Sequence, residues 1–420
     1  TTAGNIDFSG NYNNLGTVTL DAGYVADADS ALGLGEEPIV IAAGKIDVDT
    51  SVRGTHGVFT LDTDDVGTID SDITVYGKLA SGTNSLVATT DTGKITSEFT
   101  ASNYEMVAEA GLDITAGDGT KNADDLVGEA GNIVLTSVNG DIESTNNTSL
   151  VSAGTDADRY GKIGNITATT GSTYSEENKA VDTATAADIG TVSFDGISNG
   201  IIGDIAGTTE DGNITFEGTY NHTVGKITLT AGQVIDTSYN AAGADVVIAA
   251  GDITFDAIFG STATTTIKEI TLTATGVYDD TMTYTPTETV DKVTGSIDFT
   301  ADFGGLWNDA NTNGKIDSGE LITVTPTSID ATVTDGTIDF TANNNIAVPA
   351  NVGFGAVLQN VTLTSEGSSE TGTTGDILVN GTGAFGKIEN IEVTTGSGDA
   401  TYDATWGATT AKNITLTSLA

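Results

Sequence analysis

The chain repeats a short phrase in which a glycine is followed by alternating polar and apolar residues. It reads Gly-Asn-Ile-Thr-Phe at 212–216 and Gly-Lys-Ile-Thr-Leu at 225–229, and closely similar phrases stand at 4–8 and 16–20. Because successive side chains of a strand point to opposite faces, each phrase predicts a short strand with two apolar side chains on one face. A strand that buries so little must stack on neighbouring strands to form a core.

The phrases are spaced like the units of a repeat protein. In the second half they begin about 40 residues apart, at Gly212, Gly251, Gly295, Gly336 and Gly375. Short strands joined by loops of unequal length predict an all-β fold, a β-solenoid or β-helix whose strands stack in register. Tandem β-sandwich domains are the alternative, although their strands usually carry more inward positions. Only 104–110 and 178–189 resemble short helices, and both also read as loops.

The two halves of the chain resemble each other. Residues 4–50 align with 212–257 at close to half identity, and the best block sets 39–46 against 246–253. This similarity predicts an internal duplication, with one β-repeat half at 1–207 and another at 208–420. A calcium-loop insertion near 305–322 is expected in the second half.

The composition is acidic and poor in aromatic residues. Apolar residues make up 38% and aromatic residues 6% of the 420 residues, which suits a narrow stack with a thin core. The net charge of −45 repels phosphate backbones and anionic lipids, so we expect neither nucleic-acid binding nor membrane insertion. No apolar run has transmembrane length and no signal segment is seen, so we interpret the chain as a mature one. The absence of Cys suits a bacterial or archaeal exterior.

One stretch, 309–320, has the ligand spacing of a calcium-binding loop. Oxygen-bearing side chains stand at its first, third, fifth, ninth and twelfth positions, with glycine at the sixth, where such loops bend. The expected ligands are Asp309, Asn311, Asn313, Lys315 through its carbonyl, Asp317 and Glu320. The stretch resembles the loops of EF-hand and dockerin-type proteins, and this resemblance implies calcium as a cofactor.

The resemblance ends at the edges of the loop. Residues 303–307 make a poor entering helix and 321–325 read as a strand, so the ligand pattern is carried over without the helix pair. Two asparagines replace aspartates, which predicts weak binding with a dissociation constant of about 10⁻⁴–10⁻³ M. The alternative is an ordinary Asn/Gly turn between strands.

The sequence gives little support to catalysis, and we expect no enzyme. There is no Cys nucleophile, and His56 and His222 stand singly in polar stretches. No nucleophile elbow or phosphate-binding loop is present, although a carboxylate pair for glycoside hydrolysis is not excluded by spacing. The acidic clusters 62–67 and 118–125 complete no known metal pattern, and we interpret them as solvated loops.

Threonine is frequent at the outward positions of the predicted strands, as in Thr228/Thr230 and Thr271/Thr273. Regular threonine ladders can bind ice or sugars. Here we expect loops and acidic residues to interrupt the ladders, so we interpret threonine as a favourable exposed strand residue. The Asn-Ile-Thr sequons follow from the repeated phrase and carry glycans only where exported proteins are glycosylated.

The combination of acidic composition, repeated short strands and a calcium loop resembles bacterial and archaeal surface-layer proteins and secreted β-solenoid fibres such as haemagglutinin-like adhesins. The resemblance implies an extracellular structural protein that self-assembles into a surface layer, sheath or filament stabilised by calcium. We expect the strand at 413–417 to pair with the first strand of another copy.

Two other classes of function stay open. One is an adhesin that binds glycans such as cell-surface polysaccharide, with candidate aromatic contacts at Tyr278, Tyr284, Tyr402 and Trp406. The other is a polysaccharide-active β-helix enzyme, which requires a cleft with converging carboxylates.

Overall fold

The computed structural model is all-β throughout the residues it describes, with no helix among them. The described residues are 5–12, 16–22, 24–26, 40–43, 45–55, 59–63, 73–81, 86–90, 95–101, 129–130, 132–137, 141–148, 150–151, 159–160, 162–170, 191–198, 200–209, 212–221, 223–236, 246–259, 266–274, 295–303, 326, 328–333, 336–343, 357–365, 375–396 and 398–419. The all-β prediction is confirmed within them. The segments considered as helices, 104–110 and 178–189, lie outside the described residues.

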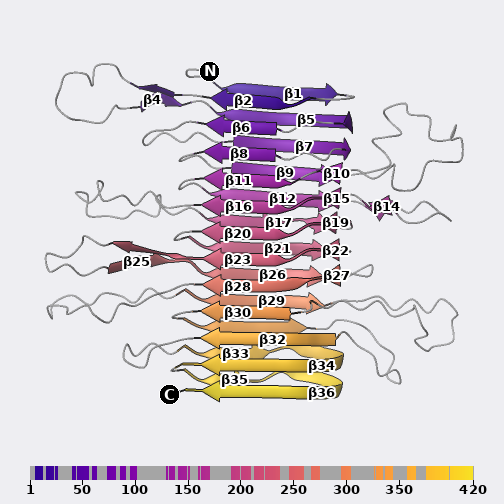
Figure 1. Cartoon of the computed structure of the whole chain (residues 1–420), viewed down its shortest axis with the longest axis vertical. Helices are drawn as coiled ribbons and strands as arrows, with labels where there is room; N and C mark the ends of the chain where they lie inside the picture. Colours follow the sequence, from indigo (N-terminus) through magenta and orange to yellow (C-terminus); the bar gives the residue numbers. More distant parts are fainter. Residues whose placement is uncertain are drawn as a thin grey trace, which may run out of the picture. The chain divides into compact units, whose positions relative to one another are not determined.

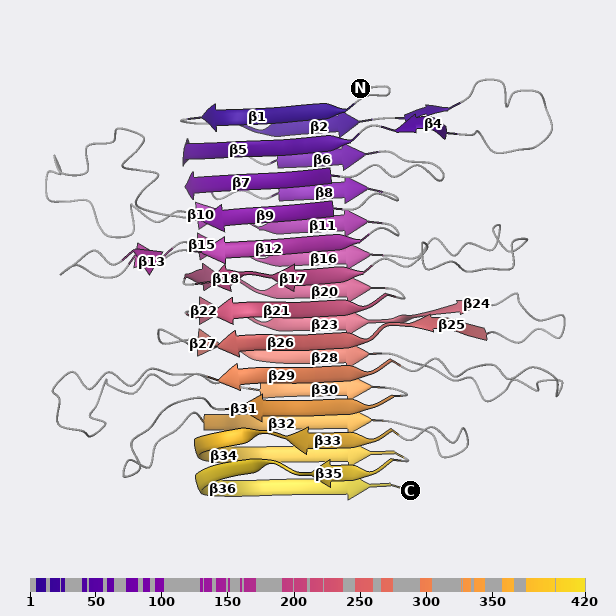
Figure 2. The same cartoon turned by 180° about the vertical axis from the view of Figure 1, so that it is seen from behind.

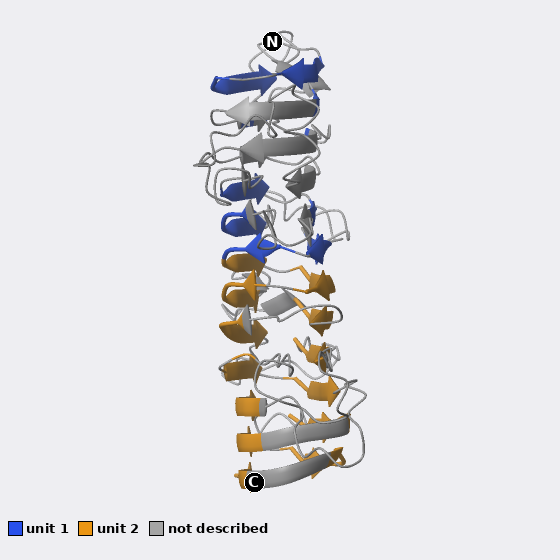
Figure 3. Ribbon diagram, turned by 90° about the vertical axis from the view of Figure 1, so that its right-hand side faces the viewer, with its two compact units in different colours: residues 1–173, 186–203 blue, residues 174–185, 204–420 orange. Residues whose placement is uncertain are grey.

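The chain divides into two compact units, which Figure 3 draws in different colours. Unit 1 comprises residues 1–173 and 186–203, and unit 2 comprises residues 174–185 and 204–420. The predicted halves, 1–207 and 208–420, rest on sequence similarity and not on compactness, so the duplication stays a prediction.

Unit 1 contains two long parallel sheets and a short one. Its first sheet has the order β1 (Ile6–Tyr12), β5 (Ile46–Thr55), β7 (Ile73–Ser81), β9 (Ile95–Ala101), β12 (Ile142–Thr148) and β17 (Val192–Asp195). Its second sheet has the order β2 (Val18–Ala22), β6 (Phe59–Thr63), β8 (Leu86–Thr90), β11 (Ile133–Ser137) and β16 (Ile166–Thr170). The short sheet consists of β10 (Glu129–Ala130), β15 (Lys162–Ile163) and β19 (Ile201–Ile202), and β18 (Ile197–Ser198) pairs with β12.

Unit 2 has the same organisation, and Figures 1 and 2 show the strands of each of its sheets lying one above another. Its first sheet has the order β21 (Ile214–Tyr220), β26 (Ile253–Phe259), β29 (Ile297–Phe303), β31 (Ile338–Asn343), β33 (Ile377–Asn380) and β35 (Ala400–Tyr402). Its second sheet has the order β20 (Ile205–Thr209), β23 (Ile227–Ala231), β28 (Glu269–Ala274), β30 (Ser328–Val333), β32 (Val357–Ser365), β34 (Thr382–Thr395) and β36 (Thr405–Ser418). A third sheet pairs β22 (Thr223–Val224) with β27 (Thr266–Ile267).

The chain of unit 2 passes through its sheets in a repeated order. It runs from β21 in the first sheet through β22 in the third to β23 in the second, and then from β26 through β27 to β28. Each strand pairs in parallel with the strand one circuit further on, and Ile214 and Phe216 of β21 stand opposite Ile253 and Phe255 of β26. Because β-sandwich sheets are antiparallel, this pairing is not that of the tandem-sandwich alternative.

A ladder of stacked aromatic rings fills the core of unit 2. The same inward position on adjacent strands is occupied by Phe216, Phe255, Phe299 and Phe340, all fully buried. Neighbouring ring centroids lie 4.8 Å apart, with interplanar angles of at most 16°. A second ladder runs beside it through Tyr220, Phe259 and Phe303. Because each ring covers the next, every circuit depends on its neighbours for a closed core.

In phrases such as those at 212–216 and 251–255, the opening glycine and the polar residue after it build the corner before a first-sheet strand. A Cβ on Gly251 would collide with the carbonyl oxygen of Gly212, so the close approach of successive corners requires glycine. The next residue accepts a hydrogen bond from one circuit further on. Asp252 N–H donates to Asn213 Oδ1 at 2.9 Å, and Ser296 N–H donates to Asp252 Oδ1 at 2.8 Å. The Asn or Asp of the phrase therefore has a structural role in holding the register.

Short antiparallel pairs interrupt the parallel pattern. In unit 1, β3 (Tyr24–Ala26) pairs with β4 (Val40–Ala43), and in unit 2, β24 (Gln233–Asp236) pairs with β25 (Val246–Ala250). Both pairs precede a first-sheet strand and both contain a register shift. This is the order expected if 4–50 and 212–257 are copies. A third pair joins β13 (Leu150–Val151) and β14 (Arg159–Tyr160).

The otherwise apolar core of unit 1 contains buried polar side chains at the level of β12 and β18. Ser144, Asn146 and Ser198 are buried there, and Asn146 Nδ2 donates to Ser144 Oγ at 2.9 Å. Asn146 Oδ1, on a side chain only 3% exposed, has no hydrogen-bond partner among the described residues. A buried acceptor without a donor costs about 1–3 kcal/mol, so this level of unit 1 is weaker than an apolar one.

Replacing a ring in the middle of the ladder tests its role. Phe299→Ala should lower the free energy of unfolding by about 3–5 kcal/mol, because it leaves a cavity between two ring neighbours. The matched control Ile258→Thr, at a position 40% exposed on β26, should change it by about 0.5 kcal/mol or less. Urea unfolding followed by circular dichroism measures both variants, and equal losses would contradict the central role of the ladder.

Candidate functional site

The second sheet of unit 2 presents a regular polar face. In β23 the inward residues Ile227, Leu229 and Ala231 are fully buried, whereas Thr228 and Thr230 between them are exposed or half-buried. In-register pairing repeats this alternation on each following strand. The outward face therefore consists of columns, with one residue from each strand.

One of these columns is threonine alone. It holds Thr208, Thr230, Thr273, Thr332, Thr364, Thr394 and Thr417, each opposite the next. The column two residues earlier in each strand holds Ala206, Thr228, Thr271, Asp330, Thr362, Glu392 and Thr415. These two columns together are called the threonine face below.

The expectation that loops would interrupt the threonine ladders is wrong for the first column. Unequal loops join its strands, yet the strands stay in register. Acidic residues enter only the second column, at Asp330 and Glu392. The signal was present in the repeated Ile-Thr-Leu-Thr at 227–230 and 414–417, but the sequence does not show which phrases share a sheet.

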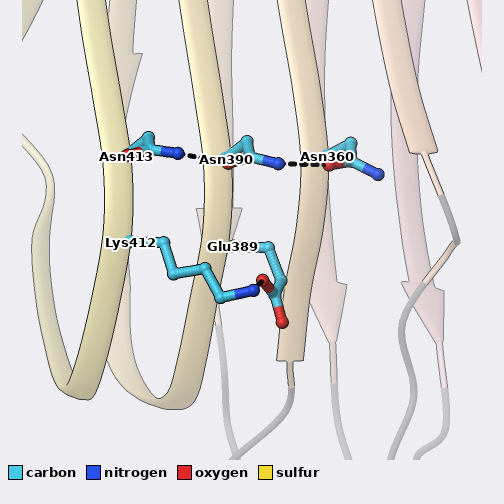
Figure 4. Close-up of polar contacts among 5 residues, drawn as sticks. All are labelled: Asn360, Glu389, Asn390, Lys412 and Asn413. Atoms are coloured by element: carbon cyan, nitrogen blue, oxygen red, sulfur yellow. Dashed lines mark hydrogen bonds and ion pairs between the residues drawn. The ribbon is translucent and has the colours of Figure 1, made fainter.

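A third column, two residues before the second one, carries an amide ladder (Figure 4). Asn390 Nδ2 donates to Asn360 Oδ1 at 2.8 Å, and Asn413 Nδ2 donates to Asn390 Oδ1 at 2.9 Å. Lys412 and Glu389 form an ion pair beside the ladder. Stacked amides bond one strand to the next, so this column fixes the register of the threonine face.

The same column is charged at its other end. Lys226 Nζ lies 2.5 Å from Glu269 Oε2, and the hydrogen bond and charge of Glu269 raise the pKa of Lys226. Both side chains are about half exposed, at 51% and 42%, so the pair adds little to stability. The Lys226 N–H donates to Asp204 Oδ1 at 2.9 Å, which repeats the corner bonds of the first sheet.

The outward face of the first sheet of unit 2 is acidic. Asp298 stands opposite Asp339, and Glu217 stands opposite Asp256 on the neighbouring strands. Strands β21, β26, β29 and β31 carry no Lys or Arg. Burial raises the pKa of the Asp298 carboxyl, and the charges of Asp339 and Asp256 raise it further. These carboxylates repel one another at neutral pH and would be stabilised by cations.

The calcium ligands predicted from the sequence, Asp309, Asn311, Asn313, Lys315, Asp317 and Glu320, lie outside the described residues. So do His56, His222 and the acidic cluster 118–125. Of the cluster 62–67, only Asp62 and Thr63 are described, and Asp62 stands opposite Asp21. Within the described ranges, no group of three or more His, Asp or Glu is placed to hold a metal ion.

Two of the aromatic residues considered for glycan binding lie together in unit 2. The rings of Tyr402 and Trp406 meet edge to face, with centroids 5.8 Å apart. Trp406 Nε1 donates to the Ala342 carbonyl at 2.8 Å, and burial raises the pKa of Tyr402. Both rings are half-buried against the unit, which favours a packing role. Tyr278 and Tyr284 lie outside the described residues.

Strand β36 exposes apolar side chains that its neighbour buries. Ile414 is 42% and Leu416 is 44% exposed, whereas Ile391 and Val393 at the same positions of β34 are 1% and 0% exposed. Leu419 is 66% exposed. A further parallel strand paired with β36 would cover the first two side chains.

No protein-family model, curated protein or solved structure matches the chain. Among the described residues, no helix has the length and apolar composition needed to cross a bilayer.

The raised pKa of Asp298 predicts a pH-dependent cost to the fold. An acid with a raised pKa in the folded state stabilises the fold at low pH, and this contribution is lost as the pH rises through the raised value. Asp298→Asn, which mimics the protonated form, should therefore increase stability at neutral pH and lose this advantage near about pH 3. Thermal unfolding at both pH values measures the difference, with Asp302→Asn on the same strand as the control. An advantage of Asp298→Asn that stays the same at both pH values would contradict the assignment.

Proposed function

We propose that the chain is an extracellular structural protein, built as a β-solenoid, that self-assembles into a surface layer, sheath or filament stabilised by calcium. The observation that carries this proposal is the repeated circuit of unit 2, in which β21, β22 and β23 are followed by β26, β27 and β28. Each strand pairs in parallel with the strand one circuit on. Stacked circuits of this kind define solenoid architectures.

The side-chain ladders support a structural role. Stacked rings join the circuits inside unit 2, and stacked amides join them outside. Glycines and Asn or Asp side chains repeat the same contacts at the corners. A structure in which each element bonds to its neighbours in one direction suits an extended scaffold.

Self-association through strand addition would use β36, where a further strand can pair. Ile414 and Leu416 occupy inward positions of the repeat, and a strand from a second copy would bury them. Strand β2, with Val18 buried and Thr19 exposed, has the alternation that such a strand requires. Strand addition provides main-chain hydrogen bonds as well as apolar contacts.

Two features favour a role for calcium, namely the negative net charge of the chain and the ligand pattern at 309–320. A net charge of −45 makes copies of the chain repel one another unless cations screen the acidic surfaces. The loop would hold an ion through Asp309, Asn311, Asn313, Lys315, Asp317 and Glu320. Weak binding at this loop would match millimolar extracellular calcium.

Calcium dependence can be tested by negative-stain microscopy of the purified chain. With calcium we expect ordered sheets or filaments, and with a chelator we expect them to dissolve. Glu320→Gln removes the expected bidentate ligand and should raise the calcium concentration needed for assembly about tenfold. Glu143→Gln, on the exposed side of β12, removes the same charge elsewhere and should leave it unchanged.

The outcomes separate the two parts of the proposal. Monodisperse particles with and without calcium would overturn self-assembly. Assembly that is insensitive to both the chelator and Glu320→Gln would retain the scaffold and overturn the calcium loop.

A further inference from the structure

The threonine face is a two-dimensional grid of side chains on a single sheet. We propose that this face binds the surface lattice of ice. This inference goes beyond the structural role, because it requires only unit 2 and no assembly. The partner it names is crystalline water, which is uncharged and repeats regularly in two directions.

The spacing of the grid is fixed by the backbone. Parallel strands lie about 4.8 Å apart, and alternate residues along a strand lie about 6.7 Å apart. Thr228 and Thr230 therefore form one row of the grid, and Thr271 and Thr273 form the next. The same two-threonine row returns at Thr362/Thr364 and Thr415/Thr417. The inference requires that hydroxyls repeated at these distances fit the repeat of water oxygens at an ice surface.

Threonine has the chemistry that such a partner requires. Its hydroxyl both donates and accepts hydrogen bonds, as a water molecule does. Its branched Cβ restricts the first side-chain torsion, so little conformational entropy is lost when the hydroxyls of a column take one orientation. The amide ladder of Asn360, Asn390 and Asn413 holds the strands in register beside the grid.

Charge distinguishes the first column of this face from the outward face of the first sheet. The first column has no charged residue on any strand of the second sheet, whereas the first sheet presents Glu217, Asp256, Asp298 and Asp339. An uncharged column in a chain of net charge −45 complements an uncharged partner. The two columns also contain no aromatic side chain to stack on a sugar ring, which favours ice over a glycan.

The experiment uses the full chain at low concentration with a chelator, so that assembly is not required. We expect thermal hysteresis and enrichment of the protein in a slowly growing ice front. Thr332→Tyr places a large ring in the middle of the uncharged column and should reduce both by about tenfold, because neighbouring threonines lose contact with the lattice. Thr300→Tyr makes the same change on the outward face of the first sheet and should leave both unchanged.

Circular dichroism and thermal unfolding establish that both variants fold. Absence of hysteresis and of ice enrichment in the unchanged chain would overturn the inference. So would an equal loss in Thr332→Tyr and Thr300→Tyr. Binding to polysaccharide on a glycan array without affinity for ice would also overturn it and would assign the face to an adhesin. None of these results bears on assembly, so the structural role is tested separately.

Discussion

A strand that buries only two or three side chains cannot form a core, and the architecture follows from this constraint. In unit 2, the stacked rings of Phe216, Phe255, Phe299 and Phe340 join four successive first-sheet strands, with neighbouring centroids 4.8 Å apart. The contact is possible only when the strands are parallel and in register, because a shift of one residue would turn the ring outward. The core is therefore closed in only one register. At the corners, the close approach of the glycines and the hydrogen bond to Asn213 follow that same register.

The register of the core also determines which residues stand opposite each other on the outer faces. Since Ile227 stands opposite Ile270, Thr228 must stand opposite Thr271 and Thr230 opposite Thr273. The segments that join these strands differ in length in the sequence, yet the strands stay in register. One sheet can thus carry an uncharged threonine column while the other carries rows of carboxylates, and a repetitive fold offers different chemistry on different faces. This separation allows a scaffold to hold a binding face without a cleft.

The sequence was sufficient to predict the strands but not to predict which strands pair with one another. Alternation in Ile-Thr-Phe at 214–216 and Ile-Thr-Leu at 227–229 predicts short strands with an apolar side, and both are observed. Which strand pairs with which depends on contacts across loops of unequal length, and no local pattern encodes these contacts. For this reason the threonine column was expected to be interrupted. A calcium loop at 309–320 could be predicted because its expected ligands are local in sequence, but this stretch lies outside the described residues.

The most direct test of this account is disulfide formation between paired cysteines, since the chain has no Cys of its own. Thr230→Cys with Thr273→Cys places two thiols opposite each other on β23 and β28, about 4.8 Å apart at the Cα atoms. Thr230→Cys with Thr271→Cys places them on the diagonal, about 7–8 Å apart, which is beyond easy bridging. Under mild oxidation the account predicts an intramolecular disulfide in the first variant and free thiols in the second. Equal cross-linking, or cross-linking of the diagonal pair alone, would contradict the in-register parallel stack.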